Sequence, residues 1–142
     1  MFKLLENVTY ADLPDPYLRY DQITNNFVLL QPLVTPEITV PVGDYTDGAS
    51  RPEFVDMFVK RYDRHFAACI VHDYMYRHAI VLPGYEHDPK AGADALFEVN
   101  LYRCSKLYGY PAEKIPAMVA GVKSFGRGAY GSKCYYSLEC DA

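Results

Sequence analysis

The chain has 142 residues, the length of one domain, and its 50% hydrophobic residues suffice for a single core. Its formal net charge of −4, with scattered Lys and Arg residues, excludes a global attraction to nucleic acid or anionic membranes. No segment approaches the ~18 uninterrupted apolar residues that span a bilayer, and the N-terminus lacks the apolar stretch of a signal peptide. We therefore expect one domain over residues 1–142, made in the cytoplasm without a transmembrane segment.

Residues 1–50 carry β patterns. Short strands are predicted at 2–10, 17–20, 27–30 and 37–42. Prolines cannot donate to a sheet ladder, and five of them divide this part of the chain into short pieces: Pro14, Pro16, Pro32, Pro36 and Pro41. We expect a small antiparallel β-meander.

From residue 51 the apolar residues recur with a helical period. A short helix is predicted at 51–61, followed by three longer ones at 63–80, 89–108 and 111–125. Pro111 suits the first turn of the last helix, which should stop where glycines begin. The predicted fold class is α+β: a β-rich part over 1–50, a helical core over 51–130 and a tail over 131–142.

The first candidate site lies on the helix predicted at 63–80, where His72 and Asp73 are followed by Tyr76. A histidine, a carboxylate and a phenol at this spacing can supply a general base, a metal ligand and a tyrosine that steadies the partner of the base. The structural alternative is a partly buried histidine whose ring is bonded to a backbone carbonyl.

Two other segments can complete such a site. Asp94 lies on the apolar face of the next predicted helix, and buried carboxylates are rarely unpaired, so His72 or Tyr76 is its expected partner. The segment 44–52 contains Asp47 and Gly48, a turn that can aim backbone carbonyls at a hard cation. By itself this segment is better explained as a plain turn before a helix cap.

The order of these segments resembles that of the bacterial and fungal secreted phospholipases A2. The corresponding stretches are Thr-Asp-Gly-Ala-Ser at 46–50, Cys-Ile-Val-His-Asp-Tyr-Met-Tyr-Arg at 69–77, Ala-Asp-Ala-Leu-Phe at 93–97, and Ala-Gly-Val-Lys-Ser-Phe-Gly at 120–126. Nearly the whole chain also resembles a small uncharacterised family common in tailed phages and prophages. That second resemblance implies a viral protein of the host cytoplasm that can also be incorporated in the virion.

The phospholipase resemblance implies a role for each matching residue. His72 would deprotonate water, Asp94 would fix its tautomer, and Tyr76 would hydrogen-bond Asp94. Asp73 would supply the carboxylate for Ca²⁺, and the carbonyls of Asp47 and Gly48 would complete the ligands from the protein. The implied substrate is a phospholipid or another ester.

The cysteines depart from the pattern of the secreted enzymes. Ala49 replaces the loop cysteine that would pair with Cys69, so we expect Cys69 to be a thiol. Cys134 and Cys140 can pair with each other or remain reduced. The chain has four cysteines, and they lack the spacing of a structural zinc site: Cys69, Cys104, Cys134 and Cys140.

Two further functional classes stay open. A metal-dependent phosphohydrolase would also use a His-Asp doublet, with His65 and Asp94 as further ligands, although His65 lies about 10 Å from His72 along a helix axis. A non-enzymatic phage virion, tail or assembly protein that keeps the phospholipase-like fold is the second alternative, with phage structural proteins as partners.

Overall fold

The computed structural model describes residues 13–46 and 64–125. In these residues five short strands precede three α-helices, so the fold is α+β, as predicted. The predicted strand at 2–10, the predicted helix at 51–61 and the tail from 131 lie outside the described residues. No helix in the described part of the chain is long and apolar enough to cross a membrane.

The strands form two small antiparallel sheets. In the first, β1 (Leu18–Asp21) pairs with β2 (Asn26–Leu29), and β2 pairs with β5 (Tyr45–Thr46). In the second, β3 (Leu33–Val34) pairs with β4 (Thr39–Val40). The order β1-β2-β5 is not a plain meander, because the β3–β4 hairpin is inserted between two neighbouring strands.

Strand lengths differ from the prediction for local reasons. The strand predicted at 37–42 is limited to Thr39–Val40, flanked closely by Pro36 and Pro41. The side chain of Thr35 closes the β3–β4 turn by accepting from the Ile38 backbone N–H at 3.1 Å and donating to its carbonyl at 2.6 Å. The strands β3 and β5 have two residues each, too few to show a period in the sequence.

The helices are α2 (Phe66–His78), α3 (Pro89–Tyr108) and α4 (Ile115–Phe125), with a 3₁₀ turn, η2 (Ala112–Lys114), before α4. The predicted bounds of α3 are confirmed. Its start is fixed by Asp88, whose carboxylate accepts from the backbone N–H of Ala91 at 3.1 Å. Its end is fixed by Gly109 at φ 76°, a left-handed conformation that glycine adopts without steric cost.

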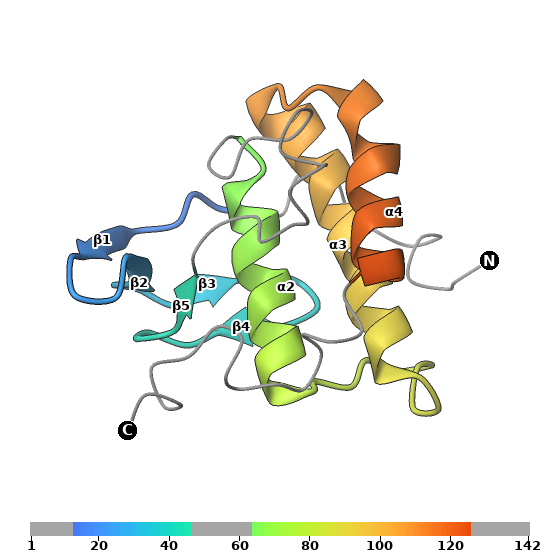
Figure 1. The fold of residues 1–142 in the computed structure, drawn as a ribbon, viewed down its shortest axis with the longest axis horizontal. Coiled ribbons are helices and arrows are strands. Elements are labelled where there is room, and N and C mark those ends of the chain that lie inside the picture. Colours follow the sequence, from blue (N-terminus) through green and yellow to red (C-terminus); the bar gives the residue numbers. More distant parts are fainter. Residues whose placement is uncertain (1–12, 47–63, 126–142) are drawn as a thin grey trace.

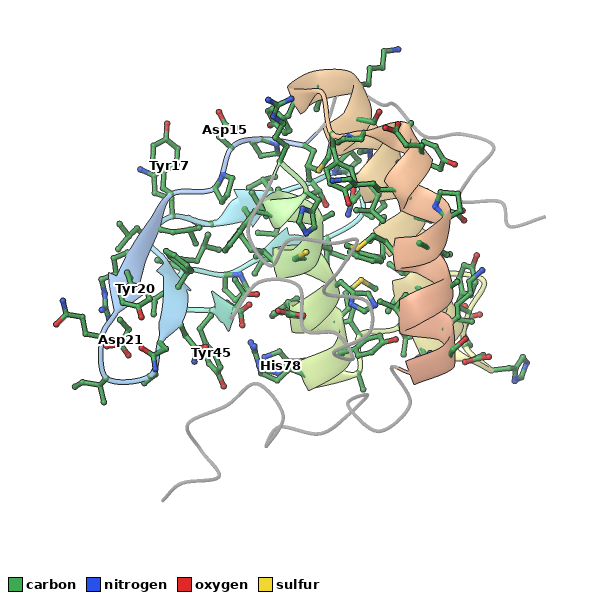
Figure 2. The ribbon with its side chains drawn as sticks, turned by 45° about the horizontal axis from the view of Figure 1, so that its top comes forward. Asp15, Tyr17, Tyr20, Asp21, Tyr45 and His78 are labelled. Carbon is green, nitrogen blue, oxygen red and sulfur yellow. The ribbon has the colours of Figure 1, made fainter. Side chains whose placement is uncertain are left out.

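The elements are arranged in layers (Figure 1). The strands lie on one side of α2, α3 packs against the other side, and α4 packs against α3. Tyr17 and Tyr20 project from the strand side of the molecule and are 60% and 49% exposed (Figure 2). The helix α2 is therefore the central element, and ten of its 13 residues are buried.

Two apolar clusters hold these layers together. The first joins the strands to α2 and α3 through Leu29, Leu33, Val40, Ile70, Val71, Met75, Leu96 and Val99. The second joins α2, α3 and α4 through Ala68, Cys69, Phe97, Leu101, Cys104, Ile115, Met118 and Val119. A bidentate ion pair adds a polar link, since Arg103 of α3 donates to both carboxylate oxygens of Glu37 at 2.7 and 2.8 Å. The facing sides of α2 and α3 are thereby fixed against each other.

Candidate active site

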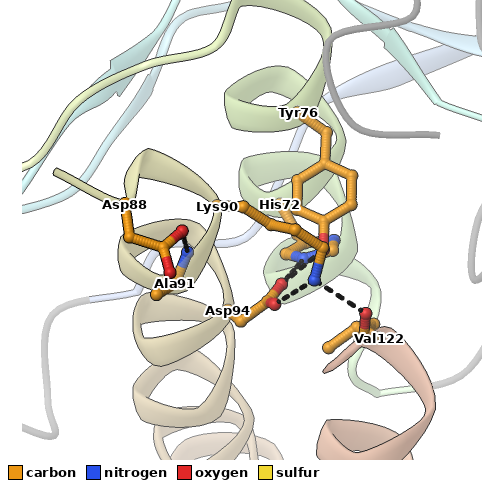
Figure 3. Close-up of polar contacts among 7 residues, drawn as sticks. All are labelled: His72, Tyr76, Asp88, Lys90, Ala91, Asp94 and Val122. Atoms are coloured by element: carbon orange, nitrogen blue, oxygen red, sulfur yellow. Dashed lines mark hydrogen bonds and ion pairs between the residues drawn. The ribbon is translucent and has the colours of Figure 1, made fainter. Parts of the chain in front are cut away.

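The facing sides of α2 and α3 bring His72 and Asp94 together, although 22 residues separate them in the sequence (Figure 3). His72 Nε2 lies 2.9 Å from Asp94 Oδ1. The hydroxyl of Tyr76, one turn along α2, donates to the same oxygen at 2.5 Å. The predicted contacts of Asp94 with His72 and Tyr76 are thus confirmed. The partner of Nε2 is therefore a carboxylate and not the backbone carbonyl of the structural alternative.

The three side chains are enclosed. His72 is 5% exposed, Asp94 2% and Tyr76 1%. The imidazole packs against two rings, with centroid distances of 4.0 Å to Tyr76 and 4.5 Å to Phe97. This packing limits rotation of the imidazole and keeps Nε2 directed at the carboxylate. In the part of the chain that the structure describes, the other nitrogen, Nδ1, forms no hydrogen bond.

Lys90 completes the surroundings of Asp94 and was not found by sequence reasoning. Its Nζ donates to Asp94 Oδ2 at 2.7 Å and to the backbone carbonyl of Val122 at 3.2 Å (Figure 3). It also lies 5.7 Å from the centroid of the Tyr76 ring. The available signal was the spacing, because a lysine four residues before an aspartate lies on the same face of a helix.

Burial and these contacts set the charges. Burial lowers the pKa of His72 below its ordinary value of 6.5, against the opposing effect of Asp94. Burial also opposes ionisation of Asp94, but its hydrogen bonds to His72, Lys90 and Tyr76 keep its carboxyl pKa below the usual range. At neutral pH the pair is a neutral imidazole and a carboxylate. Nε2 then carries the hydrogen that Asp94 accepts, and Nδ1 carries a lone pair.

Asp73 points to the strands instead. The hydroxyl of Thr46, the last residue of β5, donates to its carboxylate, and Asp73 is 3% exposed. Asp47 and Gly48, the other predicted calcium ligands, lie outside the described residues. Within residues 13–46 and 64–125, no group of three His, Cys, Asp or Glu side chains is arranged to hold a metal ion.

One turn beyond Asp73, Arg77 forms a second set of buried polar contacts, with Asp44 and with the first residue of β5. Its guanidinium donates to Asp44 at 2.5 Å and to the carbonyl of Tyr45 at 2.7 Å, and it covers the Tyr45 ring at 3.9 Å. Burial raises the pKa of Asp44 to about 6, although Arg77 opposes this effect. In Figure 2, Tyr45 lies on the same side of the molecule as His78, at the end of α2. These contacts fix the chain where it leads to Asp47.

His65 is not part of the His72 cluster. It precedes the first residue of α2, and its ring packs on Tyr110 with a centroid distance of 4.9 Å. The phosphohydrolase alternative, which needs His65 beside Asp94, gains no support from this position.

Cys69 and Cys104 are buried thiols of the second apolar cluster, so the prediction for Cys69 is confirmed. Burial raises the pKa of Cys104 to about 12, and a thiol of that pKa is unreactive.

Comparison with known families places the chain in one of them. A family model described as a protein of unknown function (DUF1353) matches residues 22–113, and the chain belongs to this family. No curated protein and no solved structure matches the sequence. The matched segment includes His72, Asp73, Tyr76, Lys90 and Asp94.

Proposed function

We propose that this DUF1353 protein is an ester hydrolase in which His72 activates water, and that its substrate is a phospholipid. The observation that carries the proposal is the buried pair of His72 and Asp94, with Tyr76 donating to the same carboxylate oxygen. The order of its motifs also resembles that of the secreted phospholipases A2. We further propose a phage or prophage origin, based on the second resemblance of the sequence.

The chemistry follows from the tautomer. Nδ1 of His72 accepts a proton from a water molecule, and the resulting hydroxide attacks the ester carbonyl carbon. Asp94 stays a carboxylate that accepts the hydrogen bond from Nε2–H, and it stabilises the imidazolium while that cation exists. As the carbonyl re-forms, the bond from its carbon to the alcohol oxygen breaks, and the imidazolium gives its proton to that oxygen. Tyr76 holds the carboxylate in the orientation that this cycle requires.

We propose a calcium site beside this pair. Asp73 adjoins His72 in sequence, its carboxylate accepts from the Thr46 hydroxyl, and Asp47 and Gly48 follow Thr46 directly in the sequence. A carboxylate and backbone carbonyls are the oxygen ligands that Ca²⁺ takes. When bound, the ion would polarise the ester carbonyl and neutralise its oxyanion. We propose Asp73, Asp47 and Gly48 as its ligands from the protein.

The test is release of fatty acid from phospholipid vesicles with and without Ca²⁺. His72→Gln should lower the rate by a factor of about 10²–10⁴, because it removes the base. His78→Gln is the matched control, since the same change is made at an exposed position of the same helix. Asp73→Asn should also lower the rate, and additional Ca²⁺ should restore part of it. Additional Ca²⁺ should not restore the His72 variant.

The pH dependence gives an independent check. Because burial lowers the pKa of His72, the base is neutral at pH 6.5 and above, and the rate should fall only below that pH. Wild-type protein that neither hydrolyses lipid or other esters nor binds Ca²⁺ would refute the proposal. If such protein were also stoichiometric in assembled phage particles, the non-enzymatic alternative would replace it.

A further inference from the structure

We propose that Lys90 is a positioning residue of the His72–Asp94 pair, one that fixes the carboxylate and ties it to the end of α4. The effect of Lys90 on catalysis rests on the proposed function. The positioning of Asp94 by Lys90 does not depend on that function. Lys90 matches none of the motif residues through which the chain resembles the phospholipases. The observation behind it is that one ammonium group bonds both Asp94 and Val122.

The first step concerns the charge of Asp94. The charged or titratable groups that contact it, among the described residues, are Lys90 on its own helix and His72 and Tyr76 on α2. Tyr76 is neutral, and burial favours the neutral form of His72. Lys90 is therefore the cation that compensates a carboxylate whose side chain is 3% exposed. This differs from an exposed pair at the same spacing, which water screens.

The second step concerns the anchoring of Lys90 itself. Val122 belongs to the last four residues of α4, whose carbonyls have no partner within the helix. A cation is favoured there because the helix dipole places partial negative charge at this end. The ammonium thus has two fixed acceptors, one on α3 and one on α4, and its side chain is only 16% exposed. It holds Oδ2, while His72 and Tyr76 bind Oδ1.

The third step is the consequence for the base. Without Lys90, the buried carboxylate keeps only neutral donors, which favours uptake of a proton by Asp94. A protonated Asp94 donates to Nε2 of His72, so the ring hydrogen moves to Nδ1. In that tautomer Nδ1 has no lone pair for the proton of water, and catalysis stops at the first step.

The experiment compares Lys90→Met with Lys90→Arg, and uses Lys106→Met, at an exposed position of the same helix, as the control. Nitrogen NMR of ¹⁵N-histidine-labelled protein at pH 7 reports the ring tautomer. We expect the Nε2–H form of His72 in wild type, in the control and in Lys90→Arg, whose guanidinium can donate to both acceptors. In Lys90→Met this form should be depleted.

Kinetics supply the second measurement. Lys90→Met should lower kcat by about tenfold to a hundredfold with KM nearly unchanged, because it depletes the tautomer that accepts a proton from water without removing a contact to substrate. Lys90→Arg should restore most of kcat. If Lys90→Met does not fold, Lys90→Gln replaces it, because its amide can still donate to Asp94 while it carries no charge. The same depletion of the Nε2–H form is then expected.

The two proposals fail separately. A folded Lys90→Met or Lys90→Gln variant that keeps the wild-type tautomer, with kcat equal to that of the Lys106 control, overturns the role of Lys90 and leaves the hydrolase intact. A wild-type protein without esterase activity, in which Lys90→Met still shifts the tautomer, overturns the hydrolase. It leaves Lys90 as the residue that positions Asp94.

Discussion

Replacement of Asp94 by asparagine should destabilise the fold much more than its conservative chemistry suggests. The carboxylate receives three donors, from His72, Tyr76 and Lys90, and an amide has only one oxygen to accept them. Its NH₂ group must face either the ammonium or Nε2–H. Removing one member of a buried ion pair costs about 3–5 kcal/mol, because the other charge stays buried.

The structure places the expected loss at the lower end of that range. Lys90 keeps its bond to Val122 and some exposure to water, so we expect a loss of about 3 kcal/mol in the free energy of unfolding. For a domain of this size that corresponds to about 10 °C in Tm. The pKa of Asp94 lies below its unfolded value, so this contribution is complete above pH 3.8 and is lost as pH falls through the folded value.

Urea unfolding at pH 7 measures the difference, and Asp88→Asn is the control. Asp88 undergoes the same substitution on the same helix, but it caps the N-terminus, where asparagine serves as well as aspartate. Its effect should stay within about 0.5 kcal/mol. Equal losses in the two variants, or a loss below about 1 kcal/mol for Asp94→Asn, would show that the buried cluster does not hold α2 and α3 together.

Two further results are expected from stability measurements. Gly92→Ala should cost about 1–2 kcal/mol because its Cβ would lie 2.9 Å from Cβ of the buried Tyr85. Gly121→Ala should gain about 0.5–1 kcal/mol, because its Cβ would meet no atom of another element within 4 Å in the described part of the chain; equal thermal shifts would contradict this. Asp44 binds a proton more readily in the folded state, so its contribution is complete below pH 3.8 and is lost as pH rises through about 6. The free energy of unfolding of Asp44→Asn, relative to wild type, should therefore rise by up to about 3 kcal/mol as the pH increases from 4 to 7. Urea unfolding across this range measures the difference, and a difference that does not change with pH would refute the reasoning.

The sequence predicted what depends on neighbours along the chain. The bounds of α3 follow from Asp88 and Pro89 at its start and Gly109 after its end, all of them local signals. His72 and Tyr76 share a face of α2 because of the helical period. The buried position of Asp94 and its need for a partner were also evident from the apolar residues around it.

The strands show where such signals end. The two-residue strands β3 and β5 carry no period, so neither was predicted, and the pairing of β5 with β2 depends on where the intervening hairpin folds. The sequence predicts Thr46 as part of a turn. In the structure it closes a sheet and donates to Asp73, a contact between residues 27 apart.

The sequence by itself therefore determined the bounds of α3, the motif His72-Asp73-x-x-Tyr76 and the carboxylate that the motif requires. Only the tertiary structure decided that Lys90, predictable as a neighbour of Asp94 on one helix face, also bonds Val122 of α4. The physical reason is the range of each effect. Helical period and capping act over about four residues, whereas the partner of a buried charge is set by which helices pack together.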